Sequence, residues 1–438
     1  MGDRGSDMLT HEQNERLTRV EGDAPMGRLM RNYWIPAVLS AQLVADGAPV
    51  RVRLLGTDHV AFRATDGRVG FFAEGCPHRG CSLVLARNQD CGLRCIFHGW
   101  KIDVDGFVAE VPTHTPNPEA FAAKVPVTHF PVHEGGGIVW VWLGSTPAPI
   151  FPELPFTLLG EHQVWMTVTK AYCNWLQGIE AALDSAHVGT LHESYVARWA
   201  GEGAGRTLSK ALETLAPRYD VERTGYGLGA AALRPLPDGT TYLRTTTWIA
   251  PFVCLVPGSS GGPHSIFIAS PIDDTHHNLF HGAFSQEDIH DGVHLPDFTR
   301  QLVGNRRYDP FNYGGFSGSR EDNYGQNRAA MQHGHFSGFT GNLLQEDMVT
   351  QASMGPIVDR TKEHLSSSDV AIIQARRLLL EAIDDMNAGR PVVGTVPGID
   401  HRDVLPLDTV LPSPDAHEPA VRVCARCGHA FAGRAVDP

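Results

Sequence analysis

The sequence predicts an α+β protein in which a small all-β domain precedes a larger domain of mixed helices and strands. Three observations support this fold class. Short β-type runs alternate with turn residues between about 37 and 145, Pro147, Pro149, Pro152 and Pro155 then mark a boundary, and beyond residue 160 helical and strand-like segments are mixed. We divide the chain into an N-terminal helical segment (1–36), the all-β domain (37–145), the larger domain (146–400) and a tail (401–438).

The composition excludes several classes of protein. A chain of 438 residues with 42% hydrophobic and 19% charged residues is typical of globular domains. A net charge of −13 argues against a nucleic-acid binder. We see no apolar run of about 18 residues and no signal peptide, and eight cysteines in this length do not form a disulfide framework. These features predict a cytoplasmic protein without membrane spans.

The elements follow in order along the chain. Residues 9–33 form an amphipathic helical pattern, and strand-like runs occupy 50–55, 60–63, 69–72 and 138–143, with hairpin turn signals at Asp66-Gly67 and Asp105-Gly106.

In the larger domain, 172–190 is predicted to be a helix, and 242–249 and 265–268 are predicted to be strands. A further helix is expected to start at the N-cap Ser368 and to end near Gly389. The Gly-, Asn- and aromatic-rich stretch 304–326 is interpreted as a surface loop. The tail carries Cys424, Cys427 and His429, which make half a zinc site, and we interpret it as a mobile tail with two free thiols.

Two short motifs in the all-β domain bear the strongest chemical signal. Cys76 and His78 form C-x-H, and after 16 intervening residues Cys95 and His98 form C-x-x-H. One thiolate and one imidazole on each loop is the ligand set of a Rieske [2Fe–2S] centre, in which two histidines replace two cysteines on one iron. A Cys₂His₂ zinc site is the alternative, but zinc fingers usually keep both cysteines together and both histidines together.

A second constellation lies in the predicted helix 172–190. Glu180, Asp184 and His187 are spaced i, i+4 and i+7, which puts them on one helical face. His192 follows five residues after His187, and Gly189 between them could loosen the helix so that the second imidazole turns toward the first. Two histidines near acidic side chains are suited to Fe(II) in a 2-His-1-carboxylate site, which leaves open positions.

At this point the chain resembles the Rieske non-haem iron ring-hydroxylating oxygenases, specifically large subunits of the phthalate dioxygenase-like family. The matching segments are the cluster motif, 174–192, 353–365 and 14–37, and the resemblance covers about 9–390. It implies a helix-grip catalytic domain with an antiparallel sheet in 146–400, against which the N-terminal segment packs. It also implies an oxygenase-type cluster, because Phe97 stands where respiratory Rieske subunits have the cysteine that would pair with Cys81.

The family's site residues can be carried over by position. The third iron ligand is expected to be Asp347, with the adjacent Glu346 as the competing assignment. Asp184 would bridge His98 of one subunit and His187 of its neighbour, which implies a homotrimer or hexamer. Arg218 and Arg244 fall where phthalate-type enzymes hold a substrate carboxylate, and solvated or structurally paired arginines are the alternative.

The resemblance implies a terminal oxygenase that uses O₂ on a small aromatic substrate, with carboxylated rings favoured. Electrons would come from NAD(P)H through a separate flavin- or ferredoxin-type reductase, since we find no Gly-rich dinucleotide fingerprint in this chain. Hydroxylation, dihydroxylation and oxidative dealkylation or ether cleavage all remain open. Two other functions compete with this one, namely a Rieske electron carrier without oxygenase chemistry and a binding or regulatory protein that has lost its activity.

Overall fold

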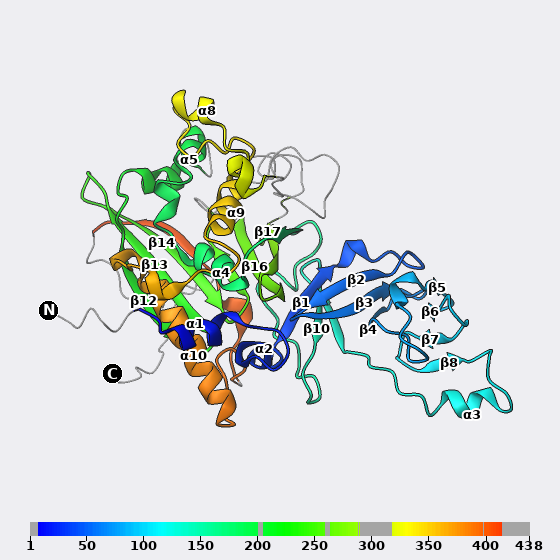
Figure 1. Cartoon of the computed structure of the whole chain (residues 1–438). Helices are drawn as coiled ribbons and strands as arrows, with labels where there is room; N and C mark the ends of the chain where they lie inside the picture. The colour runs from blue at the N-terminus through cyan, green and yellow to red at the C-terminus, as the bar shows by residue number, and fades with distance from the viewer. Residues whose placement is uncertain are drawn as a thin grey trace.

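The computed structural model describes residues 8–199, 205–258, 263–287, 289, 318–396 and 398–413. Figure 1 shows a large body of sheet and helices and, extending from it, a smaller part built of short strands. This architecture confirms the predicted α+β class, with a small all-β domain and a larger domain of antiparallel sheet and helices.

The smaller part consists of short antiparallel hairpins. A three-stranded sheet has the order β2-β3-β4, a four-stranded sheet the order β5-β6-β7-β8, and a second three-stranded sheet the order β1-β10-β9. The bounds are Trp34–Leu39 (β1), Val50–Leu54 (β2), Thr57–Arg63 (β3), Val69–Ala73 (β4), Arg87–Gln89 (β5), Gly92–Arg94 (β6), Lys101–Asp103 (β7), Val108–Glu110 (β8), Val132–Gly135 (β9) and Ile138–Trp142 (β10), with the short helix α3 at Pro118–Ala122. The strand-like runs predicted from sequence therefore form β2, β3, β4 and β10.

The larger part is built on one eight-stranded antiparallel sheet. Its order is β11-β17-β16-β15-β14-β13-β12, with β18 paired to β14. The bounds are Val164–Ala171 (β11), Arg218–Thr224 (β12), Gly227–Pro235 (β13), Thr241–Ile249 (β14), Val253–Val256 (β15), His264–Asp273 (β16), His276–Phe284 (β17) and Leu407–Leu411 (β18). Nearly every residue of β13 and β14 is buried, which is expected for strands in the interior of a sheet that is covered by other elements.

Helices pack against this sheet, and the N-terminal segment packs against two of these helices. Helix α4 contacts β14 to β17, and α10 contacts β12 and β13. The N-terminal helix α1 packs on both α4 and α10, as Figure 1 shows near the lower part of the large body. The bounds are His11–Thr18 (α1), Pro25–Met30 (α2), Trp175–Leu183 (α4), Glu193–Trp199 (α5), Gly205–Leu208 (α6), Arg328–Gln332 (α8), Leu343–Ser353 (α9) and Val370–Asn387 (α10).

One helix is shorter than its sequence suggested. Helix α4 ends at Leu183, and Asp184 has an extended backbone with φ −78° and ψ 110°. The Asp184 carboxylate accepts a hydrogen bond of 2.6 Å from the Ala186 N–H, an Asx-type turn that competes with continued helix. The prediction of a helix through 190 was therefore wrong, and Glu180, Asp184 and His187 do not share one helical face. His187 begins a separate 3₁₀ turn, His187–Gly189.

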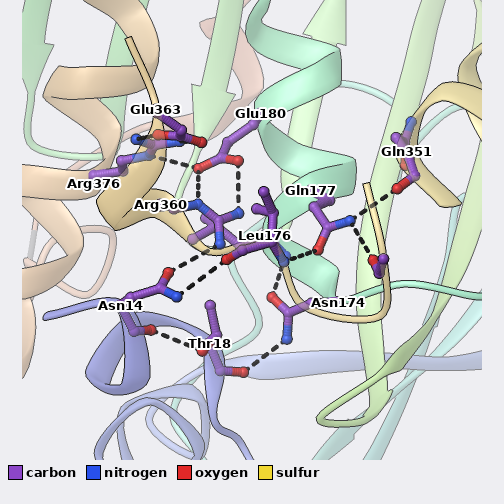
Figure 2. Close-up of polar contacts among 12 residues, drawn as sticks. Asn14, Thr18, Asn174, Leu176, Gln177, Glu180, Gln351, Arg360, Glu363 and Arg376 are labelled. Carbon is purple, nitrogen blue, oxygen red and sulfur yellow. Dashed lines mark hydrogen bonds and ion pairs between the residues drawn. The ribbon is translucent and has the colours of Figure 1, made fainter. Parts of the chain in front are cut away.

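Glu180 instead belongs to a buried ion network that joins four segments, namely α1, α4, the segment 360–363 and α10 (Figure 2). Arg360 donates to both Glu180 oxygens at 2.9 and 2.7 Å, and Arg376 donates to one of them at 2.7 Å. Arg376 also binds Glu363, and Arg360 reaches Asn14 of α1 at 3.2 Å. Burial opposes ionisation of Glu180, but the two guanidinium groups outweigh it and lower the pKa of this carboxyl. The network fastens the N-terminal segment to the helices over the sheet.

We expect Glu180→Gln to destabilise the protein by about 3–5 kcal/mol, because it leaves two buried guanidinium groups short of a counter-charge. The thermal unfolding midpoint should fall accordingly. Asp58→Asn is a matched control, since it breaks an ion pair with Arg53 whose side chains are 39% and 44% exposed and should cost less than about 1 kcal/mol. Equal midpoints for the two variants would contradict a structural role for Glu180.

Three further sequence predictions concern helix α10, the loop 304–326 and the C-terminal tail. Helix α10 starts one residue later than expected, because its N-cap is Asp369, not Ser368. It ends as predicted beside Gly389, which has φ +68°. Of the predicted loop 304–326, the part from 318 is described and contains the 3₁₀ turn Arg320–Gly325, and the rest lies outside the described residues. Cys424, Cys427 and His429 also lie outside them.

The part of the chain that the structure describes has no helix with both the length and the apolar composition needed to cross a bilayer.

Candidate metal centres

The two predicted cluster loops face each other at one end of the smaller part. Cys76 and Cys95 are each 3% exposed. Each loop closes on itself by backbone hydrogen bonds, from Gly80 N–H to the Cys76 carbonyl at 2.8 Å and from Gly99 N–H to the Cys95 carbonyl at 3.0 Å. Both glycines have positive φ, +72° and +74°, which ordinary side chains rarely adopt. The glycines therefore make the tight loops possible.

The two histidines of these loops lie together. The rings of His78 and His98 are 4.6 Å apart in an edge-to-face arrangement, and His78 stacks on Trp100 at 4.5 Å. Among the described residues the buried Nδ1 of His98 has no hydrogen-bond partner. A buried ring nitrogen without a partner and two facing buried thiols fit a cluster that takes two sulfur and two nitrogen ligands.

Cys81 and Phe97 occupy the two positions that a disulfide between the cluster loops would use. Cys81 is a free thiol, and the Phe97 ring is 55% exposed and lies 5.4 Å from the Arg79 guanidinium. No covalent link can join the loops at these positions, because phenylalanine has no thiol.

A second group of metal-ligating side chains lies in the larger part. His187, His192 and Asp347 each offer one ligand atom, and these three atoms lie within 4.8 Å of one another. The two Nε2 atoms are 3.1 Å apart, and Oδ1 of Asp347 lies 3.5 Å from Nε2 of His187 and 3.1 Å from Nε2 of His192. Two imidazoles and one carboxylate that converge in this way match the 2-His-1-carboxylate set preferred by non-haem Fe(II).

The outer nitrogen of each histidine faces a different carboxylate. Nδ1 of His192 lies 2.7 Å from Glu346 Oε2, and the other Glu346 oxygen accepts a hydrogen bond from the Ser337 hydroxyl. Nδ1 of His187 lies 3.4 Å from Asp184 Oδ2. A carboxylate behind a metal-binding histidine holds the proton on the far nitrogen and directs the lone pair of the near nitrogen inward. Sequence reasoning placed Glu346 only as a competing ligand and gave no signal for Ser337.

The charged groups around His192 and Asp347 favour positive charge at the place where these two side chains meet. Burial alone would lower the pKa of His192, but the carboxylates of Asp347 and Glu346 outweigh it and raise the pKa to about 9. Burial opposes ionisation of Asp347, yet the neighbouring imidazoles of His192 and His187 prevail and lower its pKa. The carboxylates of Asp347 and Glu346 thus flank the His192 ring, and their negative charge stabilises positive charge on this ring.

The two arginines expected to hold a substrate carboxylate are not brought together. Arg218 pairs with Leu233 across β12 and β13, and Arg244 pairs with Ala232 across β13 and β14. Because adjacent strand positions point to opposite faces, Arg218 and Arg244 lie on opposite faces of the sheet. Arg218 is exposed, whereas Arg244 is 6% exposed and bound to Asp408 at 3.1 Å. These two side chains cannot clamp one carboxylate between them.

A small β-domain with a His₂Cys₂ loop pair, joined to a sheet-and-helix domain with a 2-His-1-carboxylate group, defines a Rieske-type non-haem iron protein. Comparisons with known proteins identify the class further. The family model described as Rieske [2Fe-2S] domain matches residues 33–131, and the one described as LigXa C-terminal domain like matches 141–417.

Curated relatives match nearly the whole chain. The oxygenase subunit of phthalate 4,5-dioxygenase from Pseudomonas putida is 40% identical over 408 residues, which is 89% of each chain. The oxygenase subunit of 3-chlorobenzoate-3,4-dioxygenase from Comamonas testosteroni is 34% identical over 409 residues, 90% of this chain and 93% of the relative. The fold is similar to that of dicamba monooxygenase bound to dicamba, with a TM-score of 0.56, 16% identity and coverage of 82% of this chain and 99% of the other. The chain belongs to the Rieske non-haem iron oxygenases, among the phthalate dioxygenase-like oxygenase subunits, and it is an oxidoreductase.

Proposed function

We propose that this chain is the terminal oxygenase of a system in which a separate flavin- or ferredoxin-type reductase delivers electrons from NAD(P)H. The reaction is hydroxylation, dihydroxylation or oxidative dealkylation or cleavage of a small aromatic substrate with O₂. One observation carries the proposal: a chain with a Rieske motif also gathers His187, His192 and Asp347 within 4.8 Å, a site that an electron carrier does not need.

We assign the metal ligands as part of this proposal. Cys76, His78, Cys95 and His98 hold the [2Fe–2S] cluster. His187, His192 and Asp347 hold a mononuclear Fe(II). When bound, the cluster supplies single electrons, and the mononuclear iron supplies sites at which O₂ can be activated beside the substrate.

The protein's own side chains prepare this second site. Glu346 keeps the proton of His192 on Nδ1, and Asp184 does the same for His187, so that both Nε2 atoms present lone pairs to the metal. Ser337 fixes the orientation of Glu346 by donating to its second oxygen. Asp347 contributes the negative charge that a divalent cation needs at a site enclosed by protein.

We further propose that Asp184 connects subunits. In Figure 1 the strands β5 to β8 that frame the cluster loops lie at the far end of the chain from α9, which carries Asp347. Within one chain, an electron would therefore have a long way to travel from the cluster to the mononuclear iron. If His98 of a neighbouring subunit approached Asp184, this distance would be shorter. A closed homotrimer, or a hexamer of two trimers, would repeat the contact around a ring.

The substrate is proposed to be a small aromatic carboxylate. Phthalate and 3-chlorobenzoate, after which the two relatives are named, are both benzene carboxylates. The cysteines among the described residues are free thiols, which is consistent with a reducing cytoplasm.

Iron stoichiometry and oxygen consumption test this function together. The purified protein should contain about three iron atoms per chain, two in the cluster and one mononuclear. With a surrogate reductase and NADH, a panel of benzoates should raise O₂ uptake and yield products whose mass has increased by oxygen or decreased by a lost alkyl group. About two iron atoms per chain, with no substrate-dependent O₂ uptake, would identify an electron carrier instead.

A further inference from the structure

The turn that follows Asp184 is held through its backbone by two strands of the large sheet. Ser185, the next residue, is 4% exposed. The hydroxyl of Tyr219 in β12 accepts a hydrogen bond from the Ser185 N–H at 3.0 Å, and Nη2 of Arg234 in β13 donates to the Ser185 carbonyl at 2.6 Å. Side chains of the sheet therefore fix both backbone groups of this one residue.

These two contacts reach the Asp184 carboxylate through a planar peptide unit. The carbonyl of Ser185 and the N–H of Ala186 belong to the same peptide, so they point in opposite directions. While Arg234 holds the carbonyl, the N–H is aimed at Asp184, whose Oδ1 accepts it at 2.6 Å. The other carboxylate oxygen lies 3.4 Å from Nδ1 of His187. The hydrogen bonds to Ser185 thus help to set the direction of the Asp184 carboxylate.

Tyr219 and Arg234 project from the same face of the sheet. Tyr219 pairs with Ala232 across β12 and β13, and Ala232 lies two residues before Arg234 on the same strand. The turn packs against this face, because Val188 contacts a cluster that contains Tyr242, the cross-strand partner of Arg234. The sheet therefore supports the turn from behind.

Arg234 is an unfavourable residue for the stability of this sheet. Its side chain is 0% exposed, and its guanidinium lies 5.9 Å from the centre of the Tyr242 ring. Within the described part of the chain it forms no ion pair, and its buried Nε and Nη1 have no hydrogen-bond partner. Arg360 and Arg376, by contrast, both bind the carboxylate of Glu180. A buried cation without a counter-charge lowers the free energy of unfolding, which is typical of groups that serve a functional site.

We propose that Tyr219 and Arg234 are positioning residues that hold the Asp184 carboxylate in the direction needed for electron transfer between subunits. The inference rests on the proposed function, in which Asp184 connects two subunits. In this role both side chains act through the Ser185 backbone. A misplacement of about 1 Å can lower a rate by about 100-fold, so a turned carboxylate would slow the transfer while both metal centres stay loaded.

Tyr219→Phe tests this role with a minimal change, because it keeps the ring and removes only the hydroxyl that accepts the Ser185 N–H. Oxidation of the prereduced cluster, measured with O₂ and substrate present, should slow by about 10-fold or more. The mononuclear iron content should equal that of the wild type. Tyr33→Phe is the matched control, since it removes another buried hydroxyl, one that donates to the Val393 carbonyl at 2.6 Å. It should leave the rate per bound iron unchanged.

Arg234→Met and Arg234→Lys test the other contact. Arg234→Met should slow oxidation of the cluster without lowering the thermal midpoint, because loss of a buried, unpaired cation offsets the lost hydrogen bond. Arg234→Lys keeps a donor for the Ser185 carbonyl and should recover part of the rate, since Nη2 is the donor that reaches this carbonyl. A purely structural arginine would show the opposite pattern, with a lower midpoint and an unchanged rate per bound iron.

The double variant Asp184→Asn/Tyr219→Phe shows whether the hydroxyl acts through the carboxylate. It should be no slower than Asp184→Asn alone, because a positioning residue has no effect once the group that it positions is lost. Two single effects that multiply in the double variant would overturn the proposal. So would a wild-type rate in Tyr219→Phe, an equal slowing in Tyr33→Phe, or a loss of iron that accounts for the lost rate, which would show that the contacts hold the ligand His187 instead.

Failure of the bridge is seen separately from failure of this proposal. If Asp184→Asn oxidises its cluster as fast as the wild type, the bridge is wrong and the positioning role falls with it. If Asp184→Asn is slow and Tyr219→Phe is fast, only the positioning role is wrong. If Arg234→Met does not fold, Tyr219→Phe and the double variant decide. Iron content and O₂ uptake of the wild type test the proposed function independently of all these variants.

Discussion

Asp184→Asn is expected to keep both iron centres and to lose nearly all coupled turnover. The Asp184 carboxylate reaches His187 at 3.4 Å, and its side chain is 26% exposed, so one of its sides can meet another subunit. Asparagine has nearly the same shape but lacks the charge that, in the proposed bridge, links two imidazoles. Oxidation of the prereduced cluster, followed by stopped-flow absorbance in the presence of O₂ and substrate, should slow by about two orders of magnitude or more.

Glu346→Gln is the matched control for this experiment. Glu346 stands behind His192 as Asp184 stands behind His187, but it is 0% exposed and cannot contact a neighbouring subunit. Both variants disturb the support of one iron-binding histidine, and only Asp184→Asn removes a group that can reach a partner. Equal rates of cluster oxidation per bound iron in the two variants would rule out the bridge, and the trimer inferred from it would lose its support.

The cluster loops could be predicted from sequence because their signal is local. Cys76 and His78 are two residues apart, Cys95 and His98 are three apart, and each loop closes on its own backbone. Such spacing depends little on the rest of the fold. The strands around the loops were predicted for the same reason, since alternating apolar residues and Gly-containing turns are local features.

The larger domain was harder to predict because its contacts join distant segments. Helical periodicity put Glu180 beside Asp184, but the Asx-type turn at Asp184 ends the helix. Glu180 instead binds two arginines that lie 180 and 196 residues away in the sequence. Likewise, the opposite directions of Arg218 and Arg244 depend on strand register, which single-strand patterns do not reveal. Arg234 looks like an ordinary strand residue until the sheet buries it.

From the sequence, Asp347 was predicted as the ligand by its family position, but the adjacent Glu346 stayed a competing assignment, because neighbouring carboxylates on a helix differ mainly in direction. Helix α9 turns by about 100° per residue, so the side chains of Glu346 and Asp347 leave the helix in different directions and meet different sides of the iron-binding histidines. In the structure Asp347 lies 3.1 Å from Nε2 of His192, whereas Glu346 lies 2.7 Å from Nδ1 of the same ring. The geometry thus supports Asp347 as ligand and Glu346 as the residue that orients the ligand.

Asp347→Asn is therefore expected to lose the mononuclear iron and all substrate-dependent oxygenation while the Rieske absorption stays unchanged. An amide is a poor substitute for the carboxylate charge at a buried divalent site. Glu346→Gln should retain the iron-binding set but lower metal affinity or turnover by about 10–100-fold, as is usual when the group behind a metal-binding histidine is changed. Iron analysis after dialysis against a weak chelator, normalised to the cluster absorption, separates the two. If Glu346→Gln loses the iron and Asp347→Asn retains it, the ligand assignment is off by one residue, and the direction of the His192 ring in the metal-bound protein must be reversed.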